Sequence, residues 1–278
     1  MTGLRTALHL TRFSVKDIRR NPRVLVFTLA FPVILLVLFD SIFAKEGDTA
    51  TVPGGHDLSL DAYFVAGILA YTITLSCFST LSISLVAQRE SGQLKRLRGT
   101  PMPPWSFIAA QIARSIVLVA VMSFLLLVLG RVAFGVHIRA ESVAGLVVYI
   151  VVGAATMCAL GIAVTAFMPN ADAAGTIPPF TAVLLSFISG VFIPVDQLPD
   201  WLAAIGRFFP LAHLATGLQT ALSPDASGIG VTWRNLFVLA VWGLAGIFVA
   251  VRRFTWSPWE PDRKALRAHG LLSTLGRR

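Results

Sequence analysis

The sequence predicts an all-α polytopic membrane protein with six transmembrane helices, and three observations support this prediction. Hydrophobic residues make up 55% of the 278 residues and charged residues only 13%, whereas a soluble domain has about a quarter charged residues. Apolar runs of about 20 residues, the length that crosses a bilayer, cover most of the chain. The basic residues lie almost entirely outside these runs. We therefore expect one membrane domain, residues 1–278, with no soluble domain attached.

The net charge of +9 and the mean hydropathy of +0.75 must be interpreted together. In a soluble protein the positive charge would suggest nucleic acid, but no nucleic acid partner is expected here. Basic residues that flank apolar runs set orientation in the membrane and contact anionic headgroups. Cys77 and Cys158 both fall inside apolar runs, without the spacing of a disulfide or a metal site, and are expected to be packing residues.

Residues 1–23 are expected to form an amphipathic helix in the membrane interface. Leu4, Leu8, Val15 and Ile18 share one helical face, while Arg5, Arg12, Lys16 and Arg19 follow the same period on the neighbouring face. Such a helix buries its apolar stripe in lipid and holds its basic stripe against headgroups. The alternative is a solvated basic tail, which would not keep two stripes in register. Asn21-Pro22 is expected to end the helix.

The first two spans are predicted at 24–43 and 63–86. A basic leader before an apolar run also resembles a signal peptide, but the first run is span-length and more spans follow, so an uncleaved helix is expected. Pro32 should kink this helix or lie near a break. Residues 44–62 form an acidic loop. The second span is rich in Ser and Thr, whose hydroxyls can bond to their own helix or to another, and either packing or a polar pathway would explain them.

A basic amphipathic segment follows in the loop 88–104. Leu94 and Leu97, three residues apart, lie on one side of a short helix among Lys95 and Arg96. Gly99 and Pro101 are expected to end it. A charged amphipathic turn between two spans is well placed to dock on a partner at the membrane surface. The alternative is that its basic residues only enforce topology, and both functions are compatible.

The remaining spans are predicted at 107–130, 143–168, 176–194 and 233–251, before a basic tail, 252–278. Arg114 lies close enough to the start of its span to reach the surface with its long side chain. Pro178-Pro179 should lie near a helix start. Residues 195–212 are too broken for a span and too apolar for a free loop, with Leu198, Leu202 and Ile205 at helical spacing. They are expected to form a short re-entrant hairpin.

The distribution of Lys and Arg predicts the topology. The N-terminal leader, the segment 89–98 and the tail hold 17 basic residues, whereas the opposite face holds five. The positive-inside rule therefore places both termini and the segment 89–98 in the cytoplasm.

No catalytic constellation is evident in the sequence. There is no paired-carboxylate site, His/Cys cluster, zinc motif or phosphate-binding loop, so we expect a non-enzymatic chain that does not itself hydrolyse ATP. No span carries a carboxylate near its midplane, which weakens the case for a self-contained carrier, and no charged ring suggests a channel. Phe31, Thr74, Phe78 and Phe187 are candidates for lining a hydrophobic pathway, although packing is the simpler explanation for each.

Four features resemble the ABC-2 type permeases, the membrane subunits of ABC exporters. They are the N-terminal helix ending Arg20-Asn21-Pro22, the segment 89–97 followed by Thr100-Pro101, the six spans, and the stretch from Pro194 through Leu198-Pro199-Asp200-Trp201-Leu202 to Pro210. The resemblance covers nearly the whole chain and is greatest to the daunorubicin-resistance type. Members of that group export drugs and hydrophobic natural products in actinobacteria.

The resemblance implies roles for three sets of residues. The coupling helix, which sits in a groove of a separate ATP-binding subunit, comprises Arg89, Glu90, Ser91, Gly92, Gln93, Leu94, Lys95, Arg96 and Leu97. In it, Leu94 and Leu97 would anchor the contact, and Glu90, Lys95 and Arg96 would make its polar part. The N-terminal interface helix contributes Arg5, Arg12, Lys16 and Arg19. The external hairpin that caps the pathway contains Pro194, Leu198, Pro199, Trp201 and Pro210.

The resemblance also implies the assembly. Two permease chains, identical or related, would work with two ATPase chains in a bacterial plasma membrane, with ATP and Mg on the ATPases and no cofactor in this chain. A hydrophobic drug, natural product or lipid would be exported, giving multidrug efflux or antibiotic resistance. The alternative is a self-contained carrier or channel not coupled to an ATPase.

Overall fold

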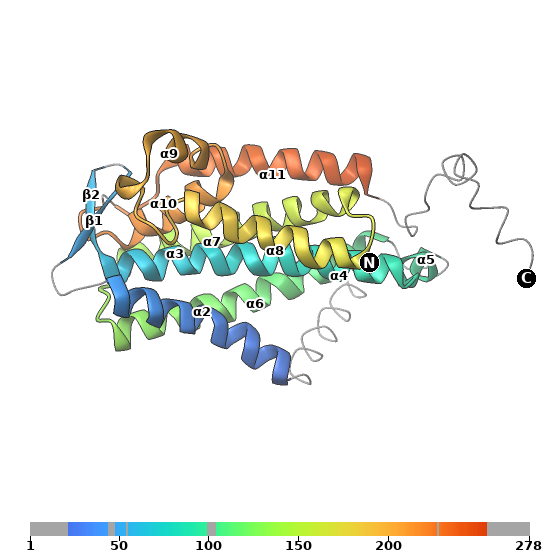
Figure 1. Cartoon of the computed structure of the whole chain (residues 1–278), viewed down its shortest axis with the longest axis horizontal. Helices are drawn as coiled ribbons and strands as arrows, with labels where there is room; N and C mark the ends of the chain where they lie inside the picture. The colour runs from blue at the N-terminus through green and yellow to red at the C-terminus, as the bar shows by residue number, and fades with distance from the viewer. Residues whose placement is uncertain (1–21, 44–47, 54, 99–103, 227, 255–278) are drawn as a thin grey trace, which may run out of the picture.

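The computed structural model describes residues 22–43, 48–53, 55–98, 104–226 and 228–254, which form an elongated helical bundle (Figure 1). Among them, five helical runs are long and apolar enough to cross a bilayer: Leu60–Glu90, Ser106–Ala133, Ala140–Phe167, Ala171–Ile188 and Trp233–Arg253. In α2 (Pro22–Phe43), the described apolar part, Ala30–Phe43, is shorter. A polytopic helical membrane protein is thus confirmed, whereas the count of six spans stays a prediction.

The second predicted span forms the centre of the bundle and consists of three segments. They are α3 (Leu60–Thr74), the π-helical η1 (Leu75–Thr80) and α4 (Leu81–Glu90). Its apolar window is 83% buried, against 17–56% for the other four runs, so the other helices surround it. The Ser and Thr hydroxyls of this span bond both to their own helix and to a neighbouring helix. Thr74 Oγ1 donates to Ala70 O at 2.9 Å, and Ser82 Oγ donates across to Gly161 O at 2.8 Å.

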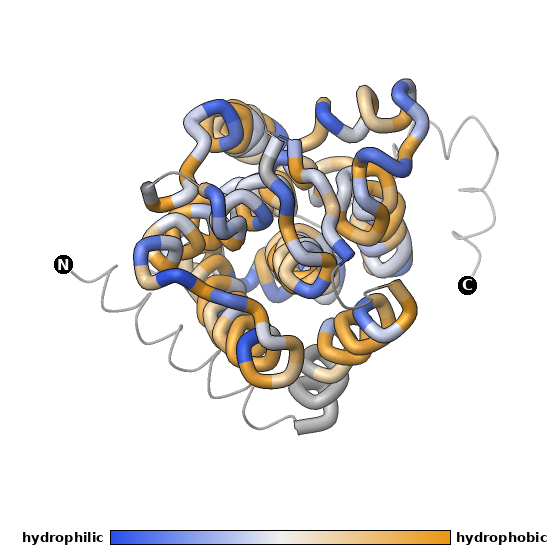
Figure 2. Tube along the Cα trace, turned by 90° about the vertical axis from the view of Figure 1, so that its left-hand side faces the viewer, coloured by the Kyte–Doolittle hydropathy of each residue, from blue (hydrophilic) through white to orange (hydrophobic). Residues whose placement is uncertain are grey.

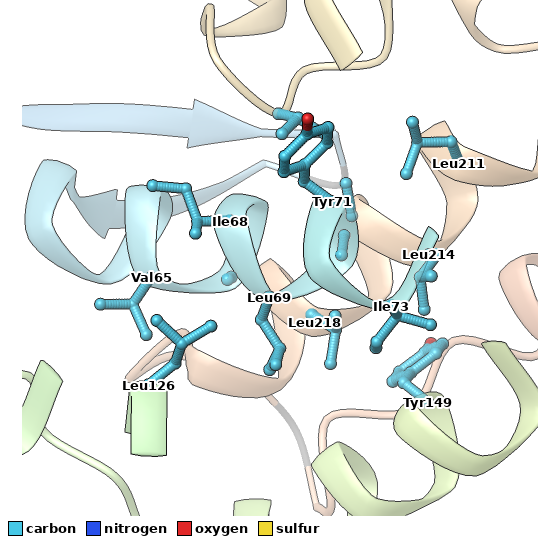
Figure 3. Close-up of a cluster of buried hydrophobic side chains, with 14 of the residues drawn as sticks. Val65, Ile68, Leu69, Tyr71, Ile73, Leu126, Tyr149, Leu211, Leu214 and Leu218 are labelled. Atoms are coloured by element: carbon cyan, nitrogen blue, oxygen red, sulfur yellow. The ribbon is translucent and has the colours of Figure 1, made fainter. Parts of the chain in front are cut away.

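The core is built from side chains of α3 and three neighbouring helices. Figure 3 shows Ile68, Leu69 and Ile73 of α3 beside Leu126, Tyr149 and Leu214, which come from α6 (Pro104–Ala133), α7 (Ala140–Val164) and α10 (Pro210–Leu222). Lipid is as apolar as these side chains, so close packing rather than exclusion from water holds helices together in a bilayer. The outer helices instead expose large apolar side chains, among them Phe124, Phe237 and Leu244. Figure 2 shows this apolar character along the helices.

Helices α6 (Pro104–Ala133), α7 (Ala140–Val164) with the 3-10 turn η2 (Thr165–Phe167), and α11 (Trp233–Arg253) match predicted spans closely. The limits predicted for the fifth span were wrong, because α8 runs from Ala171 to Ile188. Asn170 starts this helix by accepting a bond from Ala173 N at 2.9 Å. Pro178 and Pro179 therefore lie inside α8, not near its start, as membrane helices tolerate when neighbours satisfy the freed carbonyls.

The acidic loop 44–62 contains a β-hairpin that the sequence pattern did not predict. Strands β1 (Thr49–Val52) and β2 (His56–Ser59) pair antiparallel, with Gly55 at a φ of +81° in the turn. Val52 and Leu58 are buried, so one face of the hairpin packs on the end of the bundle. At 1% exposure, both side chains form part of the core.

The stretch after α8 turns back and packs against the bundle, and its being re-entrant in a membrane stays a prediction. Tyr63 donates its hydroxyl to Gly190 O at 2.5 Å, and Gln219 Nε2 donates to the same oxygen at 2.9 Å. Val191 and Phe192 are buried. The chain continues through η3 (Val195–Gln197) and α9 (Asp200–Gly206).

The predicted limit of this hairpin at residue 212 was wrong. Helix α10 continues past this limit, from Pro210 to Leu222, and nearly all its side chains are buried. Pro210 occupies the first helical position, where its missing N–H costs nothing. Leu211, Leu214 and Leu218 have helical spacing, which was the signal available in the sequence.

Candidate functional site

Arg89, at the end of α4, is buried and bonds to the end of the neighbouring α7–η2 segment. Its side chain is 2% exposed, and its guanidinium donates to Thr165 O at 3.0 Å and to Met168 O. These carbonyls lie at the negative end of a helix, where a cation is favourable. Arg89 therefore joins the second predicted span to the chain segment that connects α7 to α8.

Glu90 makes the next link of the same kind. Its carboxylate accepts a bond from Ala171 N at 2.7 Å, at the first residue of α8. The first N–H groups of a helix have no partner within the helix, and a carboxylate there also complements the helix dipole. Glu90 and Asn170 thus satisfy two N–H groups in the first turn of α8. Neighbouring Arg89 and Glu90 consequently clamp both sides of the α7–α8 connection.

The short helix α5 (Gln93–Arg98) projects beyond this clamp at one end of the bundle (Figure 1). Gly92, with a φ of +71°, makes the turn from α4, and its carbonyl accepts from Arg96 N at 3.1 Å. Ser91, Gln93 and Arg96 are exposed. Leu94 is fully buried in this chain, so in this conformation it cannot anchor a partner as the sequence suggested. It anchors α5 to its own bundle instead.

Several sequence-predicted residues lie beyond what the structure describes. Arg5, Arg12, Lys16 and Arg19 of the interface helix are outside the described residues, as are 255–278 of the tail. Lys95 and Leu97 belong to α5, but their side chains are not described.

The hairpin residues occupy the opposite end of the bundle from α5 (Figure 1). Pro194 is buried beside η3, Pro199 directly precedes α9, and Trp201 is 66% exposed. Leu198 is half-buried, and Pro210 opens α10.

The four pathway candidates separate into two pairs. Thr74 and Phe78 line an apolar cavity of about 310 Å³ between η1, α7, α8 and α11, and Phe209 is also among its lining residues. Phe31 and Phe187 do not line it. They contact an aromatic cluster instead, with ring centroids 6.4 Å apart for Phe31–Tyr71 and 5.2 Å for Phe187–Phe192.

A second apolar cavity, of about 480 Å³, lies between α6, α7 and α11 and is lined by Ile112, Cys158 and Ile247 among others. Cys77 and Cys158 are both free thiols and buried. In the described part of the chain, no three His, Cys, Asp or Glu side chains gather where they could hold a metal ion.

Together, the apolar helical bundle and the charged turn that projects from one end define a multi-pass membrane protein. The family model of the ABC-2 type transporters matches residues 6–223, and the chain belongs to this family of membrane transport subunits. The match includes the segment 89–98 and ends just after α10. The resemblance inferred from the sequence is therefore confirmed at the level of the family.

Similar curated proteins are named as permeases. The chain is 22% identical over 225 residues to the "Putative transport permease YvfS" of Bacillus subtilis, covering 81% of this chain and 87% of that protein. It is 21% identical over 209 residues to the "Inner membrane transport permease YadH" of Escherichia coli K12, covering 73% and 78%. A 22% identity over 180 residues relates it to the "Probable multidrug ABC transporter permease YbhR" of the same strain, covering 64% and 48%.

Proposed function

We propose that this chain is the permease subunit of an ATP-driven exporter that works with a separate ATP-binding subunit. In this proposal, α5 and both termini face the cytoplasm, ATP and Mg are held by the partner, and a second permease chain completes the unit. The cargo is hydrophobic or amphipathic: a drug, natural product or lipid. The apolar cavities of about 310 and 480 Å³ support this class of cargo.

The observation that carries the proposal is the clamp formed by Arg89 and Glu90. A partner that moves α5 moves α4 directly, because only Ser91 and Gly92 separate the two helices. Through the bonds to Thr165 O, Met168 O and Ala171 N, the same displacement reaches α7 and α8. The family resemblance alone suggested movement of the two spans joined by the loop. The clamp extends that movement to helices on both sides of the cavity lined by Thr74 and Phe78.

Replacement of the exposed Arg96 by alanine is expected to weaken assembly with the ATPase subunit about tenfold, since truncating an interface arginine costs roughly 1–2 kcal/mol. Arg96→Ala should leave folding unchanged, because the side chain is exposed. The measurement is the dissociation constant of the permease–ATPase complex in nanodiscs, with Arg253→Ala as a control that removes the same charge from another exposed position at the same end of the bundle.

If wild type and Arg96→Ala bind the ATPase subunit with equal affinity, the Arg96 side chain is not part of the docking contact. Transport by the purified chain without any ATPase would instead favour the self-contained carrier. In that case α5 would have no role in energy input.

Replacement of Ala245 by tryptophan tests whether cargo uses the cavity lined by Thr74 and Phe78. Ala245 is exposed on α11 and lines this cavity, so the larger ring can enter it without displacing the core. We expect about tenfold weaker stimulation of the ATPase by a hydrophobic cargo, about 1.4 kcal/mol, because the ring would occupy space that the cargo needs. Ala240→Trp, on the same helix and also exposed but not lining this cavity, should behave as wild type. If both variants respond to cargo as wild type, cargo does not pass through this cavity.

A further inference from the structure

A polar cavity of about 240 Å³ lies at the end of the bundle opposite α5, between the end of α8, α9, and the first turns of α10 and α11. Its lining includes the cationic side chains Arg207 and Arg234 together with His213, Asn235 and Ser189. None of the described residues that line it is acidic. Among the described carboxylates, none forms an ion pair with either arginine. The lining therefore carries two cationic side chains and no acidic one among the described residues, unlike the apolar cavities within the bundle.

The buried side of this cavity is preorganised. His213 is 6% exposed, and its Nε2 donates to Arg207 O at 2.9 Å, while its Nδ1 lies 2.9 Å from Asn235 Oδ1. Because the backbone carbonyl can only accept, Nε2 carries a proton. The network holds Asn235, which is 5% exposed, and fixes the backbone of Arg207. Both arginines thus rise from backbone positions held by one buried network.

Ser189 also lines the cavity and has a hydroxyl that a bound anion could accept from. It is 2% exposed, and its Oγ is buried with no hydrogen-bond partner among the described residues. A buried hydroxyl without a partner is costly, and a bound acceptor in the cavity would satisfy it.

Two helix N-termini also meet at the cavity. Ala212 and His213 belong to the first turn of α10, Arg234 and Asn235 to that of α11, and neither helix is capped by the side chain that precedes it. First-turn N–H groups and helix dipoles favour anions. The C-terminal ends of α8 and α9 also face the cavity, and their carbonyls disfavour an anion. One of these carbonyls, that of Arg207, already accepts a hydrogen bond from His213 Nε2.

We propose that this cavity binds an anionic phosphate group, and that its source is the headgroup of a phospholipid in the adjacent leaflet. Aromatic side chains beside both arginines support this source. Phe208 follows Arg207 and is 66% exposed, while Trp233 precedes Arg234 and is 81% exposed. Exposed tryptophan concentrates at the headgroup level of membranes. Binding here would tie α9 to α10 and α11, and the proposal does not depend on coupling to an ATPase.

Native mass spectrometry of the purified protein with added phosphatidylglycerol, phosphatidylcholine or inorganic phosphate tests the site. Wild type should bind phosphatidylglycerol in preference to phosphatidylcholine. Arg234→Gln should weaken that binding about tenfold, because a charge-assisted hydrogen bond is lost. Ser189→Ala should weaken it severalfold. Arg131→Gln, an exposed arginine at the same end of the bundle but outside the cavity, should not change it.

Equal binding of the two lipids would overturn the proposal, as would an equal loss in Arg131→Gln and Arg234→Gln. Saturable binding of inorganic phosphate without binding of phosphatidylglycerol would overturn the lipid source. None of these outcomes bears on the role of α5, so failure here and failure of the proposed exporter function are distinguishable.

Discussion

Replacement of Arg89 by methionine is expected to destabilise the chain and to uncouple it from an ATPase partner. Methionine keeps the apolar length of the side chain but leaves Met168 O without its donor, whereas Thr165 O loses the Arg89 bond and keeps the one from Met168 N. An unsatisfied buried polar group costs about 1–3 kcal/mol, so we expect a loss of roughly that size. The apparent Tm in detergent should fall by at least about 2 °C, at 2–4 °C for each kcal/mol.

Two control variants separate this effect from loss of a charge. Arg96→Met removes the same group from an exposed position on α5 and should leave the Tm unchanged. Arg89→Lys keeps the charge but cannot offer the planar fork of donors, so it should give an intermediate Tm. A Tm for Arg89→Met equal to that of wild type would show that the clamp does not exist as described.

The response of ATP hydrolysis to cargo should also differ between Arg89→Met and Arg96→Met. ATP hydrolysis by the assembled complex should lose its response to cargo in Arg89→Met, because motion of α5 no longer reaches the α7–α8 connection. Arg96→Met should instead reduce assembly and retain this response in the complexes that form. The two arginines, seven residues apart, would thus report on transmission and docking separately.

Some of this architecture was predictable because its signal is local. A span is encoded by about 20 consecutive apolar residues, and four of the five described spanning runs contain nearly all of their predicted range. For the other run, α8, both predicted limits were wrong. Pro178-Pro179 suggested a helix start, but prolines are tolerated inside membrane helices. The better signal was Asn170, because its side chain can cap the first turn of a helix.

The roles of Arg89 and Glu90 were not predictable, because their partners are backbone atoms 76 to 81 residues away. Backbone carbonyl and N–H groups are the same at nearly every residue, so the sequence does not show which of them a side chain will bond. Arg89 therefore looked like one more basic residue of an exposed turn. For Leu94 the apolar pattern correctly predicted a buried contact but could not tell whether it would be made with this chain or with another. For Arg89, Glu90 and Leu94 the structure shows contacts within this chain, whereas their part in a contact with an ATPase stays a prediction.

Gly161 presents the second large expected effect, at the contact between α7 and the π-helical η1. A Cβ at this position would lie 2.5 Å from Cys77 O and 2.9 Å from Phe78 O. Both are backbone atoms, which cannot rotate away as a side chain can. Gly161→Ala must therefore push α7 away from η1 and stretch the bond of 2.8 Å from Ser82 Oγ to Gly161 O. We expect a loss of about 1–3 kcal/mol or more in the free energy of unfolding.

Gly175 provides the matched control, because it lies inside α8 and a Cβ added there would meet no described atom within 4 Å. Gly175→Ala should be neutral or stabilising by up to about 1 kcal/mol, since alanine favours the helix. The midpoint of unfolding in mixed detergent measures both changes. If Gly161→Ala is as stable as Gly175→Ala, the close contact between α7 and η1 is absent from the protein in a membrane.

The same pair of variants tests whether the π-helix matters for function. A π-helical turn often marks a functional site. Phe78 of η1 lines the cavity, and η1 continues through α4 to the clamp at Arg89. If conformational change passes through this turn, Gly161→Ala should abolish the ATPase response to cargo even below the temperature at which the variant begins to unfold. Gly175→Ala should retain that response. A stable, fully responsive Gly161→Ala chain would place the moving contact elsewhere, and the connection held by Arg89 would then be the remaining route to the cavity.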